Sequence, residues 1–338
     1  MWKEETLNEF LTTPSEKLLE DISKIKGDIM ILGAGGKMGP TLSLLAKKAV
    51  EKAGRGQKIL AVSRFTDPLA TKLLNDNGVE TIAVDLLEQG ALDSLPDAEN
   101  VIYMAGRKFG TAGQESRTWA MNVWLPALVA ERYRHSNIVV FSSGNIYPML
   151  PVWSGGATEE TSPMPNGEYS MSCLGRERVF EYGSLKYHTP VFFYRLNFSI
   201  DLRYGVLCDI ASDIMAGRPV SVNMPCFNCI WQGDANEMAL RALLHTASPA
   251  ERMNITGPET VSVRFAATEL GKLLHKQVRF EGEESDSAFL NNSSKAMKTF
   301  GYPSVSLRTM LQWQAEWTLS GGRTLNKPTH FEERKGKY

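Results

Sequence analysis

Cysteine and histidine are scarce in this sequence, and long apolar runs are missing. Four cysteines in 338 residues are too few for a disulfide framework, which favours a reducing compartment. No apolar run approaches the ~18 residues that a membrane span needs. The first ten residues are acidic and interrupted by charge, whereas a signal peptide starts with basic residues and an apolar stretch. These absences predict a cytoplasmic protein that does not insert into membranes.

The sequence also has no excess of one charge. It contains 37 Lys and Arg against 38 Asp and Glu, for a net charge of −1. This balance argues against binding to nucleic acid or to an anionic membrane, and we interpret the basic residues at 334, 335 and 337 as a solvated tail. Hydrophobic residues make up 43%, which is ordinary for a folded protein and excludes disorder. The expected partner is therefore a small molecule.

One cysteine pair has a spacing that occurs in metal and redox sites. Cys226 and Cys229 form C-x-x-C, but Cys173 and Cys208 are distant, and the five histidines show no H-x-x-x-H pairing. We therefore expect packed thiols and no metal site.

Short apolar runs alternate with helical segments from residue 28 onward. This alternation is typical of a parallel sheet covered on both faces, so the predicted class is α/β, a Rossmann-like doubly wound sheet with a smaller lobe. The predicted strands are 28–32, 58–62, 81–84, 101–104, 137–142 and 190–196, and the predicted helices are 37–53, 67–77, 88–94, 114–134 and 168–187. We divide the chain into a helical extension (1–27), a dinucleotide-binding domain (28–200 with part of 226–260) and a substrate-binding lobe with a tail (201–338).

A glycine-rich turn links the first predicted strand to the first long helix. It reads GAGGKMG, with glycines at Gly33, Gly36 and Gly39 and with Lys37 and Met38 between the last two. Glycine lets the backbone approach a pyrophosphate, and the N–H groups of the following helix favour its negative charge. No Gly-Lys-Ser/Thr follows, so the turn predicts a dinucleotide rather than a nucleoside triphosphate.

The end of the second predicted strand bears on the choice of cofactor. An acidic residue there would bind the adenosine 2′-hydroxyl of NAD, whereas arginine favours the 2′-phosphate of NADP. Here Ser63 and Arg64 occupy that point. NADP is therefore favoured over NAD, the alternative being that Arg64 is simply exposed and NAD binds without it.

Further motifs then fall in the order and spacing of one family. The chain resembles the extended short-chain dehydrogenase/reductases, also called NAD-dependent epimerase/dehydratases, over roughly residues 28–320. The matching pieces are the glycine turn, Asp85-Leu86, Met104-Ala105-Gly106, Asn122, the run Ser142 to Tyr147, Tyr169 and Arg195-Leu196-Asn197. The resemblance implies a catalytic trio of Ser143, Tyr169 and Asn122. It also implies cofactor contacts from Asp85, Leu86, Ala105, Gly106 and position 173.

One position departs from the family pattern. The family's Y-x-x-x-K motif places lysine four residues after the tyrosine, but this chain has Cys173 there. In the family that lysine bonds the nicotinamide ribose and lowers the pKa of the tyrosine. A second Y-x-x-x-K string, Tyr182 to Lys186, lies too far along the same helix to replace it.

Three functions remain open after this departure. The first is an active oxidoreductase in which Arg176, or the charge of oxidised nicotinamide, compensates for the lysine. The second is a sugar epimerase or dehydratase of the same fold that passes through a keto sugar. The third is a non-catalytic NADP-binding sensor or scaffold.

The substrate lobe carries weaker signals. Residues that follow the predicted strands are candidates to line the substrate site: Lys108, Phe109, Trp153, Asn197, Phe198 and Trp231. Apart from Arg203 and Arg218 the lobe shows no cationic pair for a sugar-nucleotide diphosphate, which favours a small hydroxy or keto compound such as a sugar or sugar acid. Family resemblance also implies a homodimer through the helices of Asn122 and Tyr169, with burial of their apolar residues inside the monomer as the alternative.

Overall fold

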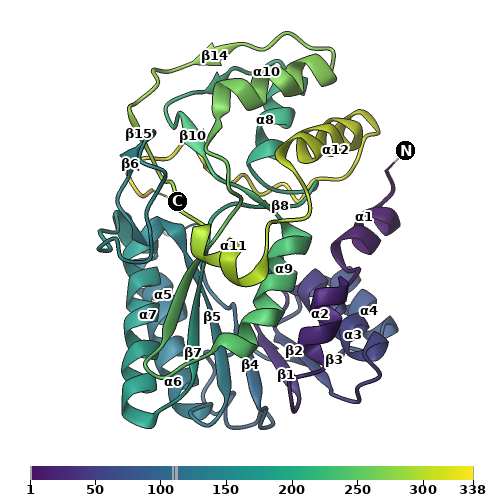
Figure 1. Ribbon diagram of the computed structural model, residues 1–338, viewed down its shortest axis with the longest axis vertical. Helices are drawn as coiled ribbons and strands as arrows, with labels where there is room; N and C mark the ends of the chain where they lie inside the picture. The colour runs from purple at the N-terminus through teal and green to yellow at the C-terminus, as the bar shows by residue number, and fades with distance from the viewer. Residues whose placement is uncertain (1, 109, 111–112, 338) are drawn as a thin grey trace.

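A seven-stranded parallel sheet forms the centre of the protein in a computed structural model, which describes residues 2–108, 110 and 113–337. The strand order is β12-β7-β5-β4-β1-β2-β3 (Figure 1). The bounds are β1 Ile29–Leu32, β2 Ile59–Ser63, β3 Glu80–Ala83, β4 Asn100–Tyr103, β5 Asn137–Ser143, β7 Val191–Leu196 and β12 Glu251–Ile255. The α/β class predicted from the sequence is confirmed, and the six predicted strands agree with the observed ones to within one residue at either end.

Strands β1, β2, β4, β5 and β7 are buried on both sides, which explains their largely apolar sequences, whereas the edge strand β3 is partly exposed. In β1, Ile29 and Ile31 face one core and Met30 and Leu32 face the other. Helices α3 (Gly39–Lys52), α2 (Glu16–Ile22), α9 (Gln232–Arg241) and α11 (Ser294–Phe300) contribute to the first core. Helices α6 (Leu125–Arg132) and α7 (Gly167–Tyr187) contribute to the second, and α4 (Pro68–Asp76) lies beside α3.

A smaller lobe covers the carboxyl ends of the strands (Figure 1). Its helices are α8 (Val206–Met215), α10 (Val263–Leu273) and α12 (Leu307–Leu319), which pack on one another. Two-residue strands complete it: β6 Leu150–Pro151, β8 Ser199–Ile200, β9 Val220–Ser221, β10 Cys226–Phe227, β11 Ile230–Trp231, β13 Val261–Ser262, β14 Phe280–Glu281 and β15 Ser287–Ala288. The cleft between lobe and sheet is where ligands bind in this class of fold.

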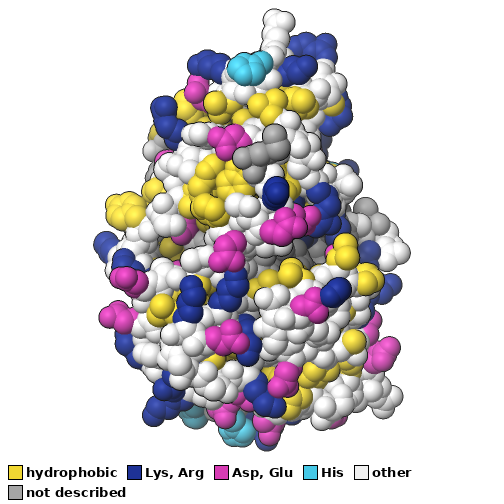
Figure 2. Space-filling view, turned by 90° about the vertical axis from the view of Figure 1, so that its right-hand side faces the viewer, with side chains coloured by type: hydrophobic (Ala, Val, Ile, Leu, Met, Phe, Trp, Pro, Cys, Tyr) yellow, Lys and Arg dark blue, Asp and Glu magenta, His cyan; other side chains and the backbone are white. Residues whose placement is uncertain are grey.

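The N-terminal extension joins these two parts. Leu7 and Leu11 of α1 (Glu4–Leu11) are buried in the core of the lobe, whereas Leu18 and Ile22 of α2 are buried against the sheet. On the side of the molecule shown in Figure 2, acidic and basic side chains are interspersed. Within the described ranges, no helix is both long and apolar enough to cross a membrane.

Two helix predictions need correction. Residues 88–94 form successive turns rather than a helix, and Gly90 there adopts φ +76, which ends regular helical geometry. The predicted helix 114–134 is divided into α5 (Glu115–Trp119), a π-helical turn (Ala120–Trp124) and α6. The π-helical turn contains Asn122, and such turns are frequent at functional sites.

Candidate active site

The glycine-rich turn has the space that a dinucleotide needs. Gly33 adopts φ +96 and lies so close to β4 that a Cβ would be 2.5 Å from the backbone nitrogen of Ala105. A Cβ on Gly36 would meet only the Gly33 carbonyl oxygen, at 3.3 Å, so this side of the turn is open. Helix α3 begins at Gly39 and directs its free N–H groups toward the turn. These residues therefore fit a pyrophosphate.

The residues expected at the adenosine end lie together. A Cβ on Gly35 would be 2.5 Å from the Ser63 hydroxyl, which places Ser63 beside the turn. Arg64 is 57% exposed and its guanidinium is 3.8 Å from the Asp85 carboxylate. The neighbouring Leu86 is buried in the second core. The geometry is open to a 2′-phosphate, but Arg64 already has a weak ionic partner.

A second turn, after β4, is held by Asn122. The Asn122 side chain accepts a hydrogen bond from the Arg107 backbone nitrogen (2.8 Å) and donates one to the Arg107 carbonyl (2.9 Å). It also donates to the Ser172 hydroxyl (2.9 Å) on α7. Asn122 is fully buried, whereas Gly106 of the same turn is exposed. Asn122 therefore fixes the turn to the helix that carries Tyr169.

Ser143 and Tyr169 meet as the resemblance implies. Ser143 ends β5 and Tyr169 lies in the first turn of α7, and a side-chain hydrogen bond joins their hydroxyl groups. A second side-chain hydrogen bond joins Tyr169 to the sulfur of Cys173. Burial raises the pKa of Tyr169 well above its ordinary value, a negative charge on Cys173 would raise it further, and the charge of Arg176 lowers it. Ionisation of Tyr169 therefore needs additional positive charge nearby.

Two lysines from the turns after β1 and β4 contact residues of the lobe and of the C-terminal tail. The Lys37 ammonium lies 3.4 Å from the centroid of the Tyr204 ring. Lys108 donates to the carbonyl oxygen of Thr329 (3.3 Å), in the C-terminal tail, and lies 5.8 Å from the centroid of the Tyr169 ring. Burial, with the charges of Lys108 and Lys327, lowers the pKa of Lys37 to about 6. Burial also lowers the pKa of Lys108, to about 8.

Asp209 of α8 is a buried acidic residue that acts on both lysines. Its carboxylate accepts hydrogen bonds from the backbone nitrogen (2.7 Å) and hydroxyl (2.6 Å) of Thr329. Burial raises the pKa of Asp209 to about 6. Its negative charge favours the protonated forms of both Lys37 and Lys108.

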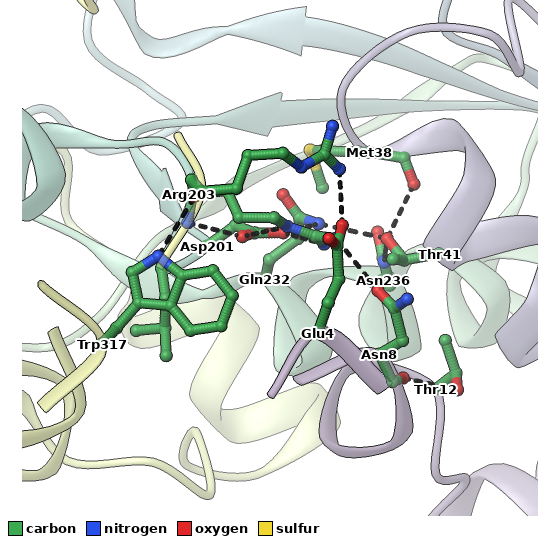
Figure 3. A network of polar contacts seen from close by, with 12 residues as sticks. Glu4, Asn8, Thr12, Met38, Thr41, Asp201, Arg203, Gln232, Asn236 and Trp317 are labelled. Atoms are coloured by element: carbon green, nitrogen blue, oxygen red, sulfur yellow. Dashed lines mark hydrogen bonds and ion pairs between the residues drawn. The ribbon is translucent and has the colours of Figure 1, made fainter. Parts of the chain in front are cut away.

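A buried polar network connects the glycine-rich turn to the lobe (Figure 3). The Thr41 hydroxyl donates to the Met38 carbonyl (3.0 Å) and accepts from the side chains of Gln232 (3.1 Å) and Asn236 (2.9 Å). Gln232 also donates to the Asp201 carboxylate (3.3 Å). The glycine-rich turn and the loop after β8 are thus fixed to the same helix, α9.

The same network continues into the N-terminal extension (Figure 3). Arg203 forms an ion pair with Asp201 (2.7 Å) and donates to Asn8 (3.0 Å) and Glu4 (3.2 Å) of α1. Tyr204 follows Arg203 directly and places its ring under Lys37. Periodicity could not indicate this arrangement, because its members come from four distant segments.

The other candidates for substrate contacts differ in their burial and in the residues that they contact. Asn197 is buried and donates to the Phe289 carbonyl (3.5 Å), and Phe198 lies 5.9 Å from the Lys108 ammonium. The prediction for Trp231 is wrong: its side chain is 2% exposed and packs edge-on against Trp313 in the lobe core, because β11 turns it inward. Trp153 is 74% exposed, and a substrate contact from it stays a prediction. Phe109 lies outside the described residues.

A family model decides the relationship of this chain to known proteins. The model of the NAD dependent epimerase/dehydratase family matches residues 29–197. The chain belongs to this family. No curated protein matches it in sequence. The family is one of enzymes that depend on a nicotinamide dinucleotide, in agreement with the turn described above.

Solved structures of epimerases and dehydratases share the fold. The dTDP-glucose 4,6-dehydratase of Bacillus anthracis, in complex with NAD, has a TM-score of 0.74 and 17% identity over 87% of this chain and 97% of its own. The UDP-glucuronic acid 4-epimerase of Bacillus cereus, with UDP-glucuronic acid and NAD, gives 0.71 and 19% over 87% and 99%. The UDP-glucose 4-epimerase of Thermotoga maritima, with UDP-glucose, gives 0.72 and 16% over 87% and 99%.

Proposed function

We propose that the protein exchanges a hydride between a nicotinamide dinucleotide and a hydroxyl-bearing carbon of a sugar, as sugar epimerases and dehydratases do. The observation that carries the proposal is the Ser143–Tyr169 hydrogen bond at the carboxyl end of β5, beside an open glycine-rich turn. When bound, the nicotinamide supplies the hydride acceptor and donor.

The residues of the chain handle the proton. In its ionised form Tyr169 takes the proton from the substrate hydroxyl and, once protonated, can return it, since it lies in the first turn of α7 beside Ser143. The Ser143 hydroxyl orients the same oxygen and stabilises the charge that develops there. The thiol of Cys173 is buried next to Tyr169. Because burial raises the pKa of this thiol and keeps it protonated, Cys173 takes no part in the proton transfer.

A second candidate for the net reaction is oxidation or reduction of a free sugar, and the ion pairs of two arginines in the lobe favour it. Arg203 is engaged by Asp201 and Glu4, and Arg218 by Asp213 (2.7 Å), so neither arginine of the lobe is held ready for a diphosphate. This favours net oxidation or reduction of a free sugar or sugar acid. The acidic group of such a compound would be attracted to Lys108, whose pKa of about 8 leaves its ammonium mostly charged at pH 7.

One assay separates these candidates. The protein, supplied with NAD or NADP, is incubated with UDP-glucuronic acid, UDP-glucose, dTDP-glucose or free glucuronic acid. A new isomer or a dehydrated sugar without net cofactor reduction indicates an epimerase or dehydratase, and accumulating reduced cofactor indicates an oxidoreductase. Binding of cofactor without turnover of sugars, sugar acids or keto acids would contradict the proposal and favour a non-catalytic sensor.

We also propose a homodimer through α5, the π-helical turn and α7. Trp119 and Trp124 are 38% and 62% exposed, and they line a groove with Val179 of α7. By contrast, Leu125 and Val129 of the same region are buried within the monomer. Trp124→Glu should convert a dimer to a monomer in light scattering, and a monomeric native protein would contradict this proposal.

A further inference from the structure

The family position for the active-site cation holds no charge in this protein. Cys173 is 1% exposed, and burial raises the pKa of its thiol. The thiol is hydrogen-bonded to Tyr169, and its raised pKa keeps it neutral at pH 7. Position 173 therefore cannot stabilise a tyrosinate electrostatically.

A buried cation lies one helical turn further along α7. Arg176 is 6% exposed, and its guanidinium donates to the carbonyl oxygen of Phe141 (2.8 Å) and to the side-chain oxygen of Asn122 (2.9 Å). Both acceptors are neutral. Within the described part of the chain, Arg176 has no carboxylate at ion-pair distance, and its Nε–H donates to no protein atom.

Glu177, the next residue on α7, belongs to a buried ion pair and provides a comparison for Arg176. Glu177 forms an ion pair with the buried guanidinium of Arg195 (2.7 Å) and accepts from the Ser142 hydroxyl (2.6 Å). An unpaired buried charge is costly, so it is retained at a structural position only with a partner. Arg176 is buried beside this pair yet does not share its carboxylate, which points to a role for its free charge.

The location of Arg176 connects it to the reacting groups. A Cβ on Gly106, in the exposed turn after β4, would be 2.5 Å from the terminal nitrogen of Arg176, so the guanidinium lies directly behind the wall of the cofactor cleft. Its positive charge lowers the pKa of both Tyr169 and Cys173. The other charged groups that face this pair are Lys108, from the turn after β4, and Glu177, which Arg195 neutralises.

We propose that Arg176 supplies the positive charge that position 173 lacks, so that the cation acting on Tyr169 has moved one turn along α7. Arg176 is then a positioning residue that acts through Tyr169, and the inference rests on the proposed function of that tyrosine. An opposite charge at short range lowers a pKa by about one to three units, which sets the size of the expected effect.

The test measures the ionisation of Tyr169 in the full-length protein saturated with NAD. The ultraviolet absorbance of phenolate is followed against pH, and the Tyr169→Phe protein is subtracted. Arg176→Lys keeps the charge, Arg176→Gln keeps a donor without the charge, and Arg176→Gln with Cys173→Lys returns the charge to the family position. The midpoint should rise by at least about one pH unit in Arg176→Gln, and should stay near the native value in the other two.

Lys108→Met is the matched control for the second cation near Tyr169. A native midpoint equal to that of Arg176→Gln would overturn the proposal. The proposal would also be overturned if Lys108→Met shifted the midpoint of Tyr169 ionisation and Arg176→Gln did not, because Lys108 would then be the cation that acts on Tyr169.

A further variant covers the case in which Arg176→Gln fails to fold. Cys173→Lys alone should lower the midpoint by less than about half a unit, because Tyr169 already has its cation, and a shift of about two units would overturn the proposal. The outcome is separable from the proposed function. Failure of the native protein to bind NAD contradicts that function, whereas an NAD complex with an unchanged Arg176→Gln midpoint contradicts only the role of Arg176.

Discussion

Two glycines of the glycine-rich turn should respond differently to an added side chain. In Gly33→Ala, the new Cβ would be 2.5 Å from the Ala105 nitrogen and 2.7 Å from its Cα, at a φ of +96. A positive φ costs a non-glycine residue about 1–2 kcal/mol, and overpacking adds about 1–3 kcal/mol. The sum, about 2–5 kcal/mol, is a large part of the 5–15 kcal/mol that is typical of folded domains.

Gly36→Val should leave the fold intact and abolish dinucleotide binding. A Cβ there meets only the Gly33 oxygen at 3.3 Å, but the side chain would fill the space that the pyrophosphate needs. We expect the affinity for NAD to fall at least tenfold, which corresponds to about 1.4 kcal/mol. Chemical denaturation gives the stability of each variant, and calorimetric titration with NAD gives its affinity.

Gly54 provides a control for both measurements. It also has a positive φ, but a Cβ there would meet nothing within 4 Å, so Gly54→Ala reports the backbone cost alone. The reasoning fails if Gly33→Ala is no less stable than Gly54→Ala. It also fails if folded Gly36→Val binds NAD as the native protein does, because the turn would then be merely structural.

Four further predictions follow from the site. NADP should bind more tightly than NAD, and Arg64→Ala should remove the difference; equal affinities measured by titration would refute the role of Ser63 and Arg64. Tyr169→Phe should abolish turnover of a substrate found by the proposed assay while cofactor binding survives, and Cys173→Ala should be nearly neutral; activity lost in the second but kept in the first would favour a thiol mechanism. Glu177→Gln should destabilise the protein by about 3–5 kcal/mol in chemical denaturation, because it leaves Arg195 buried without its counter-charge, whereas Glu181→Gln at the surface should cost less than about 1 kcal/mol. Burial lowers the pKa of Lys37 from its ordinary 10.5 to about 6 in the folded protein, so between these pH values the unfolded chain binds one more proton and the contribution of Lys37 to stability rises with pH. Lys37→Met should therefore reduce the rise in the free energy of unfolding between pH 6 and 9. An unchanged slope would contradict the burial of the ammonium.

The sequence predicted the elements of the fold better than the directions of single side chains. Strands buried on both sides carry a continuous apolar signal, so their positions were correct to within one residue. Residues 88–94 were predicted to form a helix but form turns, because Gly90 adopts a positive φ that the pattern of apolar residues does not reveal. Trp231 was misassigned because a sequence gives the type of a residue and not the face of a two-residue strand.

The site was predictable where it depends on spacing along one motif. The separation of Ser143 and Tyr169, and the register that places Cys173 after them, follow from matched motifs. The partners of Arg176, however, are a carbonyl on β5 and an asparagine in a π-helical turn, and these meet only in three dimensions. The contact of Lys37 with Tyr204 likewise depends on the network that fixes the lobe to the turn.

The position of β12 has a consequence for any attempt to divide the protein. This edge strand is formed by residues 251–255, after the first part of the lobe, and it pairs with residues 192–196 of β7. A fragment ending near residue 200 would leave the backbone of Phe192 to Leu196 without a neighbour on one side. Unprotected edges of this kind recruit other strands, so such a fragment should self-associate rather than remain as a dispersed cofactor-binding unit. The sheet is therefore complete only when the chain has passed through the first part of the lobe and returned as β12.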